Sequence, residues 1–364
     1  MSDDAFAFII HPITIRKDVN RKFPPLGTIL PEPVINWASQ FFPPLYISEI
    51  TGIQSVSTGK IIHGWFLAVP FTPPTMMRLP VEKVYNKIVA AGKKAEALGA
   101  KTMGLGAFTS VVGDAGVTIA DRLDIAVTTG DSYTVAIAIQ AICEAARLMG
   151  IDPAHSTTAV VGATGAIGKA CALMLAEQVG KLVLIGKRAD ATDQIREACQ
   201  GKKAQVSSST DVAAIYEADL ILTVTSAVDA IIEPKHLKPG AVVLDVARPR
   251  DVSVRVVRER NDVLVIEGGM VEVPGTNADF HFNFGFPEKK AFACMAETMA
   301  LTLEGVFEDY SIGRDLEPAR IHEITEIATR HGFKLSGLRS FEFAVTDETV
   351  ARVRQKAQDH RSKR

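Results

Sequence analysis

Three glycines between two apolar runs constrain the fold of this chain more than any other feature. Residues 156–188 read STTAVVGATGAIGKACALMLAEQVGKLVLIGKR. The β-branched run from Thr157 to Val161 predicts a strand, an amphipathic pattern predicts a helix to about Gln178, and the run from Leu182 to Ile185 predicts a second strand. Strand, glycine turn, helix and strand in this order are typical of a dinucleotide-binding α/β domain.

The spacing of these glycines, GxxGxxG, has a physical interpretation. One glycine makes the tight turn, another lets the backbone approach a pyrophosphate, and the third allows the helix to pack closely on the strand. The helix N-terminus then faces the phosphates. A glycine-rich turn in an ordinary α/β domain is the alternative. We expect the whole turn to bind a dinucleotide: Gly162, Ala163, Thr164, Gly165, Ala166, Ile167 and Gly168.

The residues after the second strand favour NADPH as the cofactor. An NAD-selective site places Asp or Glu about twenty residues beyond the glycines, on the ribose hydroxyls. Here Lys187 and Arg188 occupy that place, and both cations suit a 2′-phosphate. Asp190 follows closely and keeps NAD as an alternative, and a solvated pair of loop cations is the other interpretation.

The α/β alternation continues to about residue 270. A helical patch near Asp211–Glu217 is followed by apolar runs that predict strands at Asp219–Val224, Ala241–Val246 and Val263–Glu267. Such runs indicate a doubly wound, Rossmann-like sheet buried on both faces. Thr225 and Ser226, directly after the first of these strands, are expected beside the nicotinamide half of the cofactor.

The length of 364 residues is too great for one ordinary core. We expect an N-terminal α/β substrate domain over residues 1–132, a Rossmann cofactor domain with a bridging helix over 133–270, and a C-terminal helical segment over 271–364. The N-terminal domain should hold strands at Phe6–Ile10, Tyr46–Ile53, Lys60–Ala68 and Thr102–Leu105, with a helix over Val81–Leu98 that ends at Gly99. The Pro-rich stretch Phe23–Pro44 should pack as an irregular loop, because its prolines exclude a long helix.

Two loops of the N-terminal domain gather glycine, hydroxyl and apolar residues at predicted strand ends, where open α/β sheets bind ligands. One is Gly104–Ser110. The other is Thr128–Thr134, which leads into a helix from about Tyr133 to Met149 capped by Asp131 or Ser132. Turn chemistry with helix capping is the alternative interpretation of both loops. The candidate substrate-binding residues are Phe108, Thr129, Gly130, Ser132 and Tyr133.

Composition excludes several classes of protein. A net charge of −2 does not favour nucleic-acid binding. The four cysteines show no CxxC spacing, which argues against a zinc site or a disulfide framework. Asp3 and Asp4 stand where a signal peptide needs positive charge, and the apolar run after them is too short for a membrane span. A reducing cytoplasm is the expected location.

Cys294 lies in a segment, Pro287–Thr298, whose proline and apolar spacing predict a helix. Lys290, four residues earlier on the same helical face, would lower the pKa of the thiol and favour the nucleophilic thiolate. The helix dipole should contribute little about two turns into the helix. From composition alone, a helical cysteine is more often a core residue.

Eight motifs nevertheless resemble those of the cyanobacterial long-chain acyl-(acyl-carrier-protein) reductases, NADPH enzymes that convert fatty acyl thioesters to fatty aldehydes. They run in the family's order across nearly the whole chain: LGAFTSVV (105–112), VTTGDSYT (127–134), GATGAIG (162–168), LVLIGKR (182–188), EGGMVE (267–272), PEKKAFACMAETM (287–299), YSIGRD (310–315) and RHGF (330–333). The cysteine of AFACMAE corresponds to the family's acylated nucleophile. The resemblance therefore implies that Cys294 is the catalytic residue.

The implied reaction has two steps. The Cys294 thiolate attacks the acyl thioester and releases the carrier thiol, and hydride from NADPH then reduces the enzyme-bound thioester to aldehyde. The implied partner is an acyl carrier protein or a CoA thioester, while an aldehyde-consuming enzyme and a homo-oligomer are left open. Asp131 and Tyr133 depart from the family pattern, which has Asn and His there.

Two other functions remain open. One is an NADP-dependent dehydrogenase of the shikimate or amino-acid type, which needs no cysteine nucleophile. The other is a regulatory protein that binds NADPH without catalysis. The basic C-terminal run from Ala351 to Arg364 would suit an acidic carrier protein, or would be a solvated helix end or tail.

Overall fold

The chain divides into two compact units. The structure, a computed structural model, describes residues 4–13, 16, 18, 20, 29–283, 287–341 and 343–362. The first unit comprises Met1–Tyr133 with Val271–Lys334, and the second comprises Thr134–Met270 with Leu335–Arg364. The segment predicted over 271–364 is thus divided between them. Within the described part of the chain, no helix has the length and apolar character that crossing a bilayer requires.

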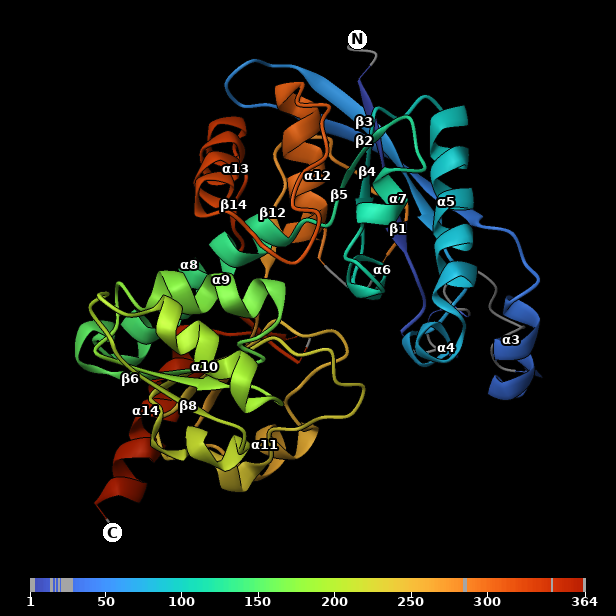
Figure 1. Ribbon diagram of the computed structural model, residues 1–364. Helices are drawn as coiled ribbons and strands as arrows, with labels where there is room; N and C mark the ends of the chain where they lie inside the picture. Colours follow the sequence, from blue (N-terminus) through green and yellow to red (C-terminus); the bar gives the residue numbers. More distant parts are fainter. Residues whose placement is uncertain are drawn as a thin grey trace. The chain divides into compact units, whose positions relative to one another are not determined.

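The first unit is built on a five-stranded sheet (Figure 1). Its order is β2 (Leu45–Gln54), β3 (Ile61–Ala68), β1 (Ala5–Ile10), β4 (Thr102–Leu105) and β5 (Ala126–Thr128). Strands β3, β1, β4 and β5 run parallel, and β2 is antiparallel to β3. The four parallel strands therefore end at the same edge of the sheet. The predicted strands are confirmed, whereas the three-residue β5 is too short for its pattern to have been predicted.

Helices cover both faces of this sheet. Helix α5 (Val81–Ala97) packs on the face that carries Ala5, Ala7 and Ile9. Helix α12 (Ala293–Glu304) lies on the opposite face (Figure 1). It approaches closely because β4 has Gly104 there: a Cβ at Gly104 would lie 2.1 Å from Oγ1 of Thr298.

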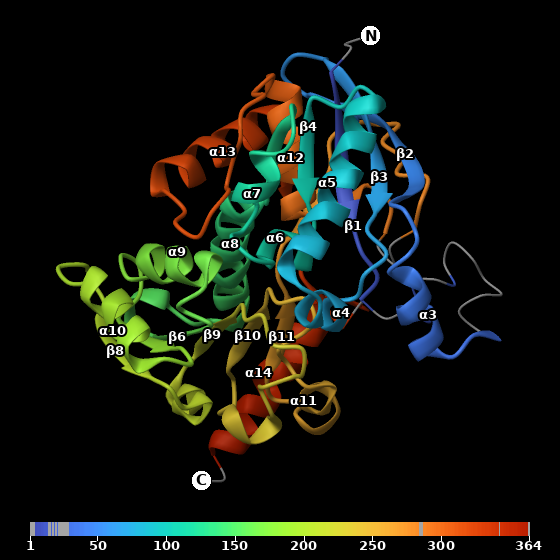
Figure 2. The same cartoon turned by 45° about the vertical axis from the view of Figure 1, so that its right-hand side comes forward.

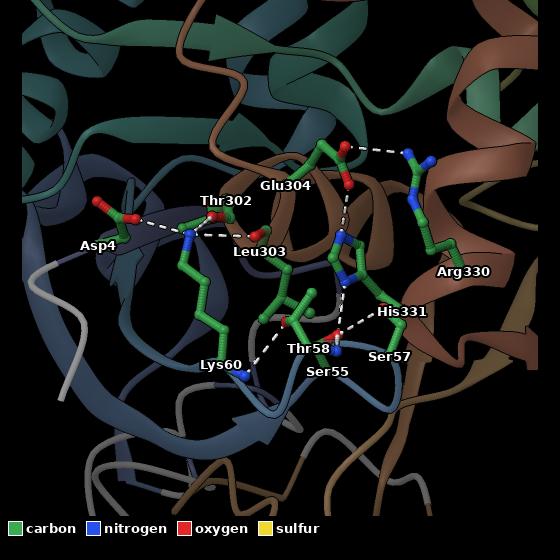
Figure 3. Close-up of polar contacts among 10 residues, drawn as sticks. All are labelled: Asp4, Ser55, Ser57, Thr58, Lys60, Thr302, Leu303, Glu304, Arg330 and His331. Carbon is green, nitrogen blue, oxygen red and sulfur yellow. Dashed lines mark hydrogen bonds and ion pairs between the residues drawn. The ribbon is translucent and has the colours of Figure 1, made fainter.

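Polar contacts hold the C-terminal end of α12 (Figure 3). Lys60 Nζ donates to the carbonyls of Thr302 and Leu303 at 3.1 and 3.0 Å, where the negative end of the helix dipole favours a cation. The buried His331 donates from Nε2 to Glu304 at 2.7 Å, and its Nδ1 lies 2.8 Å from Oγ of Ser55. These contacts fix the helix along the sheet, and so fix the position of its other end.

The remaining helices of this unit are short, apart from α13 (Pro318–His331). They are α3 (Glu32–Ser39), α4 (Pro73–Arg78), α6 (Phe108–Val111) and α7 (Val117–Ala120). The prediction of an irregular loop for Phe23–Pro44 is wrong where α3 forms, because Pro33 falls in the first helical turn, where a proline costs no hydrogen bond. Residues 23–28 of that stretch lie outside the described residues.

The second unit contains the predicted doubly wound sheet. Its strands run in the order β11 (Leu264–Glu267), β10 (Val242–Asp245), β9 (Leu220–Thr223), β6 (Thr157–Val161), β7 (Lys181–Ile185) and β8 (Gln205–Ser209), all parallel. Counted from β6, this is the order 3-2-1-4-5-6 of a dinucleotide-binding fold, which reverses direction between β6 and β9. Helix α9 (Ala166–Leu175) ends three residues before the predicted Gln178. Strand β8 and helix α10 (Ala189–Ala198) were not predicted.

Short elements complete the chain. A three-stranded sheet has the order β13 (Lys290–Phe292), β12 (Met270–Glu272), β14 (Lys334–Leu335), and a hairpin joins β15 (Arg339–Ser340) to β16 (Phe343–Ala344). The second unit also has α11 (Val254–Glu259) and the 3₁₀ turns η1 (Pro153–His155), η2 (Val212–Glu217) and η3 (Pro234–His236).

The basic C-terminal run is a packed helix as far as it is described. Helix α14 (Asp347–Arg361) buries Val350, Val353 and Ala357. His360 lies 2.9 Å from the carboxylate of Asp262, and Arg361 donates to the carbonyl of Pro239. The run up to Ser362 is therefore part of the second unit rather than a free tail.

Candidate functional site

Cys294 is the second residue of α12, in its first turn. The prediction of a helix from Pro287 is wrong: residues 290–292 form strand β13, and the carbonyl of Lys289 accepts from the N–H of Val273 at 2.8 Å. A partner so distant in sequence overrides the local helical pattern. Lys290 therefore does not precede Cys294 on a helical face, and the thiol is within reach of the helix dipole.

The loop after β5 packs directly on Cys294. Gly130 has a φ of +76°, and a Cβ on it would lie 2.3 Å from both Cα and Cβ of Cys294. Only glycine satisfies both conditions without displacing the helix. The predicted loop Thr128–Thr134 and the predicted nucleophile thus meet at the edge where the parallel strands end.

Glu297, one turn after Cys294 on α12, organises that loop. Its fully buried carboxylate accepts from Oγ1 of Thr128 at 2.5 Å, from the N–H of Tyr133 at 2.7 Å and from Oγ of Ser311 at 2.7 Å. Helix α8 (Asp131–Met149) starts at Asp131, so neither Asp131 nor Ser132 precedes it as the predicted cap. A carboxylate from a different helix satisfies the N–H of Tyr133 in their place.

Ser311 joins the same network from the segment after α12. Its carbonyl accepts from Oγ1 of Thr129 at 2.5 Å, and its hydroxyl accepts from the N–H of Ser132 at 3.2 Å. Its φ of +54° is unusual for a residue with a side chain. The hydroxyl of Ser132 is buried and has no hydrogen-bond partner among the described residues. A buried hydroxyl of this kind suits a ligand that brings its own acceptor.

Sequence reasoning missed Glu297 and Ser311. The available signal for Glu297 was its isolation, since it is the only charged residue between Lys290 and Glu304. A lone acid in an otherwise apolar helix is costly to bury unless it is hydrogen-bonded.

The electrostatics of this network disfavour a resting thiolate. Burial, followed by the negative charge of Asp131, raises the pKa of Cys294 to about 12. Burial and the neighbouring Glu297 raise the pKa of Asp131 well above its usual range, and burial raises the pKa of Glu297. The expectation of a lowered Cys294 pKa is therefore wrong for the ligand-free protein, because desolvation outweighs the favourable helix dipole.

The other predicted loop is arranged around His11. The N–H of Phe108 donates to Nε2 of His11 at 2.9 Å, and burial lowers the pKa of His11 to about 4. The imidazole is thus neutral at pH 7, with its proton on Nδ1, 3.2 Å from the carbonyl of Pro12. Phe108 itself is buried in the core between the sheet and α5. Tyr133 is also buried, which raises the pKa of its phenol.

The glycine turn of the second unit fits a dinucleotide. A Cβ on Gly162 would lie 2.5 Å from the carbonyl of Val224, and one on Gly168 would lie 2.1 Å from the carbonyl of Gly162. Gly165 is different: it is exposed, and the nearest heavy atom to a Cβ there is 3.5 Å away. The other predicted turn residues, Ala163, Thr164, Ala166 and Ile167, surround it at the start of α9. The turn therefore leaves an approach to the helix N-terminus, as a pyrophosphate requires.

The remaining predicted cofactor residues have different surroundings. Lys187 and Arg188 are exposed directly after β7, and neither makes an ion pair within the described part of the chain. Thr225 donates from Oγ1 to the buried Asp251 at 2.5 Å, and its N–H donates to the same carboxylate at 2.9 Å. Its side chain is committed to the protein, whereas Ser226 is exposed. No group of His, Cys, Asp and Glu among the described residues is arranged to hold a metal ion.

Comparison with protein families and with solved structures finds one family match and one structural similarity. Residues 144–267 match the family described as shikimate / quinate 5-dehydrogenase, which covers the glycine turn and most of the second unit. L-tryptophan dehydrogenase from Nostoc punctiforme superposes on 98% of this chain, over 89% of its own chain, with 12% identity and a TM-score of 0.43.

Two curated proteins are similar over most of the chain. The aminotransferase PigE of Serratia sp. is 28% identical over 301 residues, 82% of this chain, but the chain spans only 35% of that protein. The long-chain acyl-[acyl-carrier-protein] reductase of Synechococcus elongatus is 31% identical over 321 residues, which are 82% of this chain and 89% of the relative. The chain belongs to the family of the long-chain acyl-[acyl-carrier-protein] reductases.

Proposed function

We propose that this protein reduces long-chain fatty acyl thioesters, carried by acyl carrier protein or CoA, to fatty aldehydes with NADPH, through a thioester on Cys294. The observation that carries the proposal is the position of Cys294, in the first turn of α12 and against the Gly130 loop. The family's reductase member supports the substrate class. An acyl thioester reductase needs a thiol and oxyanion donors in one place, and this is where the chain gathers both.

Cys294 begins the reaction. Its Sγ bonds to the acyl carbon, the bond from that carbon to the carrier sulfur breaks, and the proton lost by Cys294 ends on the carrier thiol. Because the resting thiol has a pKa of about 12, the proton must leave as the acyl group arrives. The carboxylate of Asp131 acts on the thiol through its charge, and its raised pKa makes it a stronger base, so it is our candidate acceptor. When the aldehyde departs, Cys294 is the leaving group: the bond from Sγ to the acyl carbon breaks and the sulfur takes up a proton.

The oxyanion formed at the acyl carbon needs donors. The N-terminus of the twelve-residue α12 places the N–H groups of its first turn and the positive end of a dipole at Cys294. The unpartnered Ser132 hydroxyl supplies a further donor. Thr129, Gly130 and Tyr133 remain proposed substrate-binding residues through this loop, while Phe108 would act through the neighbouring one.

The cofactor would be held by the second unit. The turn from Gly162 to Gly168 would bind the pyrophosphate, Lys187 and Arg188 the 2′-phosphate, and Ser226 would lie near the nicotinamide. When bound, NADPH supplies the hydride that reduces the acyl thioester. Replacing both Lys187 and Arg188 by Ala should reduce the preference for NADPH over NADH. Equal efficiency of the two cofactors in the unaltered protein would contradict the NADPH assignment.

Acylation of Cys294 tests the proposal directly. Protein incubated with long-chain acyl-CoA or acyl carrier protein, without NADPH, should gain one acyl mass on the peptide that contains Cys294. NADPH should then release it as aldehyde. Cys294→Ala should lose both steps and still bind NADPH, whereas Cys143→Ala, at a half-buried cysteine of the second unit, should retain them. Aldehyde formation by a folded Cys294→Ala protein would show that the thioester intermediate is wrong.

One observation favours a second candidate function. The match of residues 144–267 to shikimate / quinate 5-dehydrogenase extends over the cofactor-binding part of the chain. A dehydrogenase of this type would reduce a small carbonyl compound without any acylation of Cys294. The same mass measurement separates the two candidates, because that enzyme would turn over in the Cys294→Ala variant.

A further inference from the structure

Helix α3 is anchored by polar side chains, while its large apolar side chains Val34 and Trp37 are exposed. Asn36 accepts from the hydroxyls of Thr72 and Thr75 at 3.3 and 3.2 Å, and Ser39 is the one residue of the helix that is buried. Trp37 and Phe41, by contrast, are 64% and 70% exposed. A helix that serves only the protein core has the opposite arrangement.

Exposed large apolar side chains gather on α3 and its flanks, and we call them the aromatic patch: Ile29, Val34, Trp37, Phe41 and Phe42. Met77 of α4 and Val81 of α5 are exposed as well. The rings of Trp37 and Phe41 contact each other edge to face, with centroids 5.2 Å apart. So many exposed large apolar side chains within a few turns of chain mark a binding surface.

The aromatic patch is held rigidly on the first unit. Lys87 Nζ donates to the carbonyl of Phe42 at 2.6 Å, and Lys83 Nζ donates to the side chain of Gln40 at 2.9 Å. These lysines come from the start of α5, and α4 follows β3, so the patch lies where the parallel strands end (Figure 2). Cys294 lies at the same edge of the same sheet.

Exposed cations lie on the elements next to the patch. Arg78 of α4 and Lys83 of α5 are exposed. Glu32 at the start of α3 and Glu82 at the start of α5 are paired with Arg16 and Arg122. Tryptophan and phenylalanine with basic residues at the rim are the side chains of helices that lie in the interface of an anionic bilayer.

We propose that the aromatic patch binds the surface of a bilayer that contains anionic lipid. Trp37, Phe41 and Phe42 enter the boundary between head groups and acyl chains, and Arg78 and Lys83 pair with lipid phosphates. An acidic protein partner would use the same cations and rings, and the test below separates it from a bilayer. Under the proposed function, the bilayer would also receive the long-chain aldehyde product close to where it forms.

Tryptophan fluorescence tests this proposal without substrate or cofactor, so its outcome is independent of the reductase activity. The chain has two tryptophans, and Trp65 is buried, so Trp65→Phe leaves Trp37 as the reporter. With vesicles of phosphatidylcholine and phosphatidylglycerol, the protein should co-sediment, Trp37 emission should shift to shorter wavelength, and lipids brominated on the acyl chain should quench it.

Variants locate the binding surface. In the protein with both native tryptophans, Trp37→Asp with Phe41→Asp should weaken vesicle binding by about tenfold or more, because burial of each ring contributes more than about 1 kcal/mol. Phe343→Asp is the matched control, because Phe343 is 77% exposed and belongs to the second unit. It should bind like the unaltered protein. The proposal is overturned if the double variant binds equally well, or if acyl carrier protein shifts Trp37 emission and vesicles do not.

Discussion

At the scale of single residues, the surroundings of Cys294 determine when the thiol can react. Burial and the charge of Asp131 raise its pKa to about 12, so the thiol is protonated at pH 7. Alkylation by iodoacetamide should be slow at pH 7 and should accelerate about tenfold per pH unit up to pH 10. A rate that stays flat over this range would show that the thiolate already exists at neutral pH.

Asp131→Asn restores the residue of the family pattern and tests the cause of the raised pKa. Because the negative charge of Asp131 opposes the thiolate, its removal should lower the pKa of Cys294 and increase alkylation at pH 9. Asp229→Asn, at an exposed site in the second unit, should leave the rate unchanged. If Asp131 also accepts the proton of Cys294 during acylation, the same variant should acylate more slowly while alkylating faster.

Glu297 is a positioning residue, since it contacts the loop rather than the reacting atoms. Glu297→Ala leaves three buried donors unsatisfied and should lower the free energy of unfolding by about 3 kcal/mol or more. Glu297→Gln keeps an acceptor and removes a charge whose burial is unfavourable, so it should lose about 1 kcal/mol and retain most of the acylation rate. Denaturant unfolding measures the free energy of unfolding of both variants. The control is Glu308→Ala, at an exposed site, whose free energy of unfolding should stay within about 0.5 kcal/mol of that of the unaltered protein. Equal losses in the Ala and Gln variants would contradict this role.

At the scale of elements, substitutions of the three glycines in the turn before α9 should distinguish a role in folding from a role in cofactor binding. Gly162→Ala and Gly168→Ala place a Cβ 2.5 and 2.1 Å from backbone carbonyl groups and should destabilise the second unit. Gly165→Ala has room, with nothing nearer than 3.5 Å, and should keep the melting temperature. It should nevertheless weaken NADPH binding about tenfold or more, because a methyl group would occupy the approach of the pyrophosphate. Titration of NADPH fluorescence measures the affinity, and a Gly165→Ala protein that binds normally would contradict the phosphate role.

At the scale of the whole molecule, the C-terminal helix α14 forms part of the second unit. Deleting α14 exposes the surface that Val350, Val353 and Ala357 cover, at roughly 1 kcal/mol or more for each side chain. We expect truncation after Thr346 to lower the melting temperature and NADPH affinity together. Truncation therefore cannot test whether the basic run docks a carrier protein, because it also unfolds part of the second unit. Reversing the charge of the exposed Arg352 and Lys356 tests carrier docking without removing the helix. This change should raise the KM for acyl carrier protein more than that for acyl-CoA, and an equal effect on both would exclude carrier docking.

The sequence by itself determined the elements whose signals are local. Apolar runs around GxxGxxG predicted β6, α9 and β7, because the apolar runs, the glycine spacing and the helical periodicity all lie within about thirty residues of sequence. The family motifs selected Cys294, which residue chemistry alone ranked as a core cysteine. Only the tertiary structure decided the start of α12, because residues 290–292 form strand β13, which pairs with β12.

The environment of Cys294 was also decided by tertiary structure alone. Its pKa depends on burial and on Asp131, which is more than 150 positions away in the sequence. The N-terminus of α8 is capped by Glu297 and Ser311 rather than by its own neighbours. Hydrogen bonds and charge interactions act over a few ångströms in space, and no window of sequence contains these partners together.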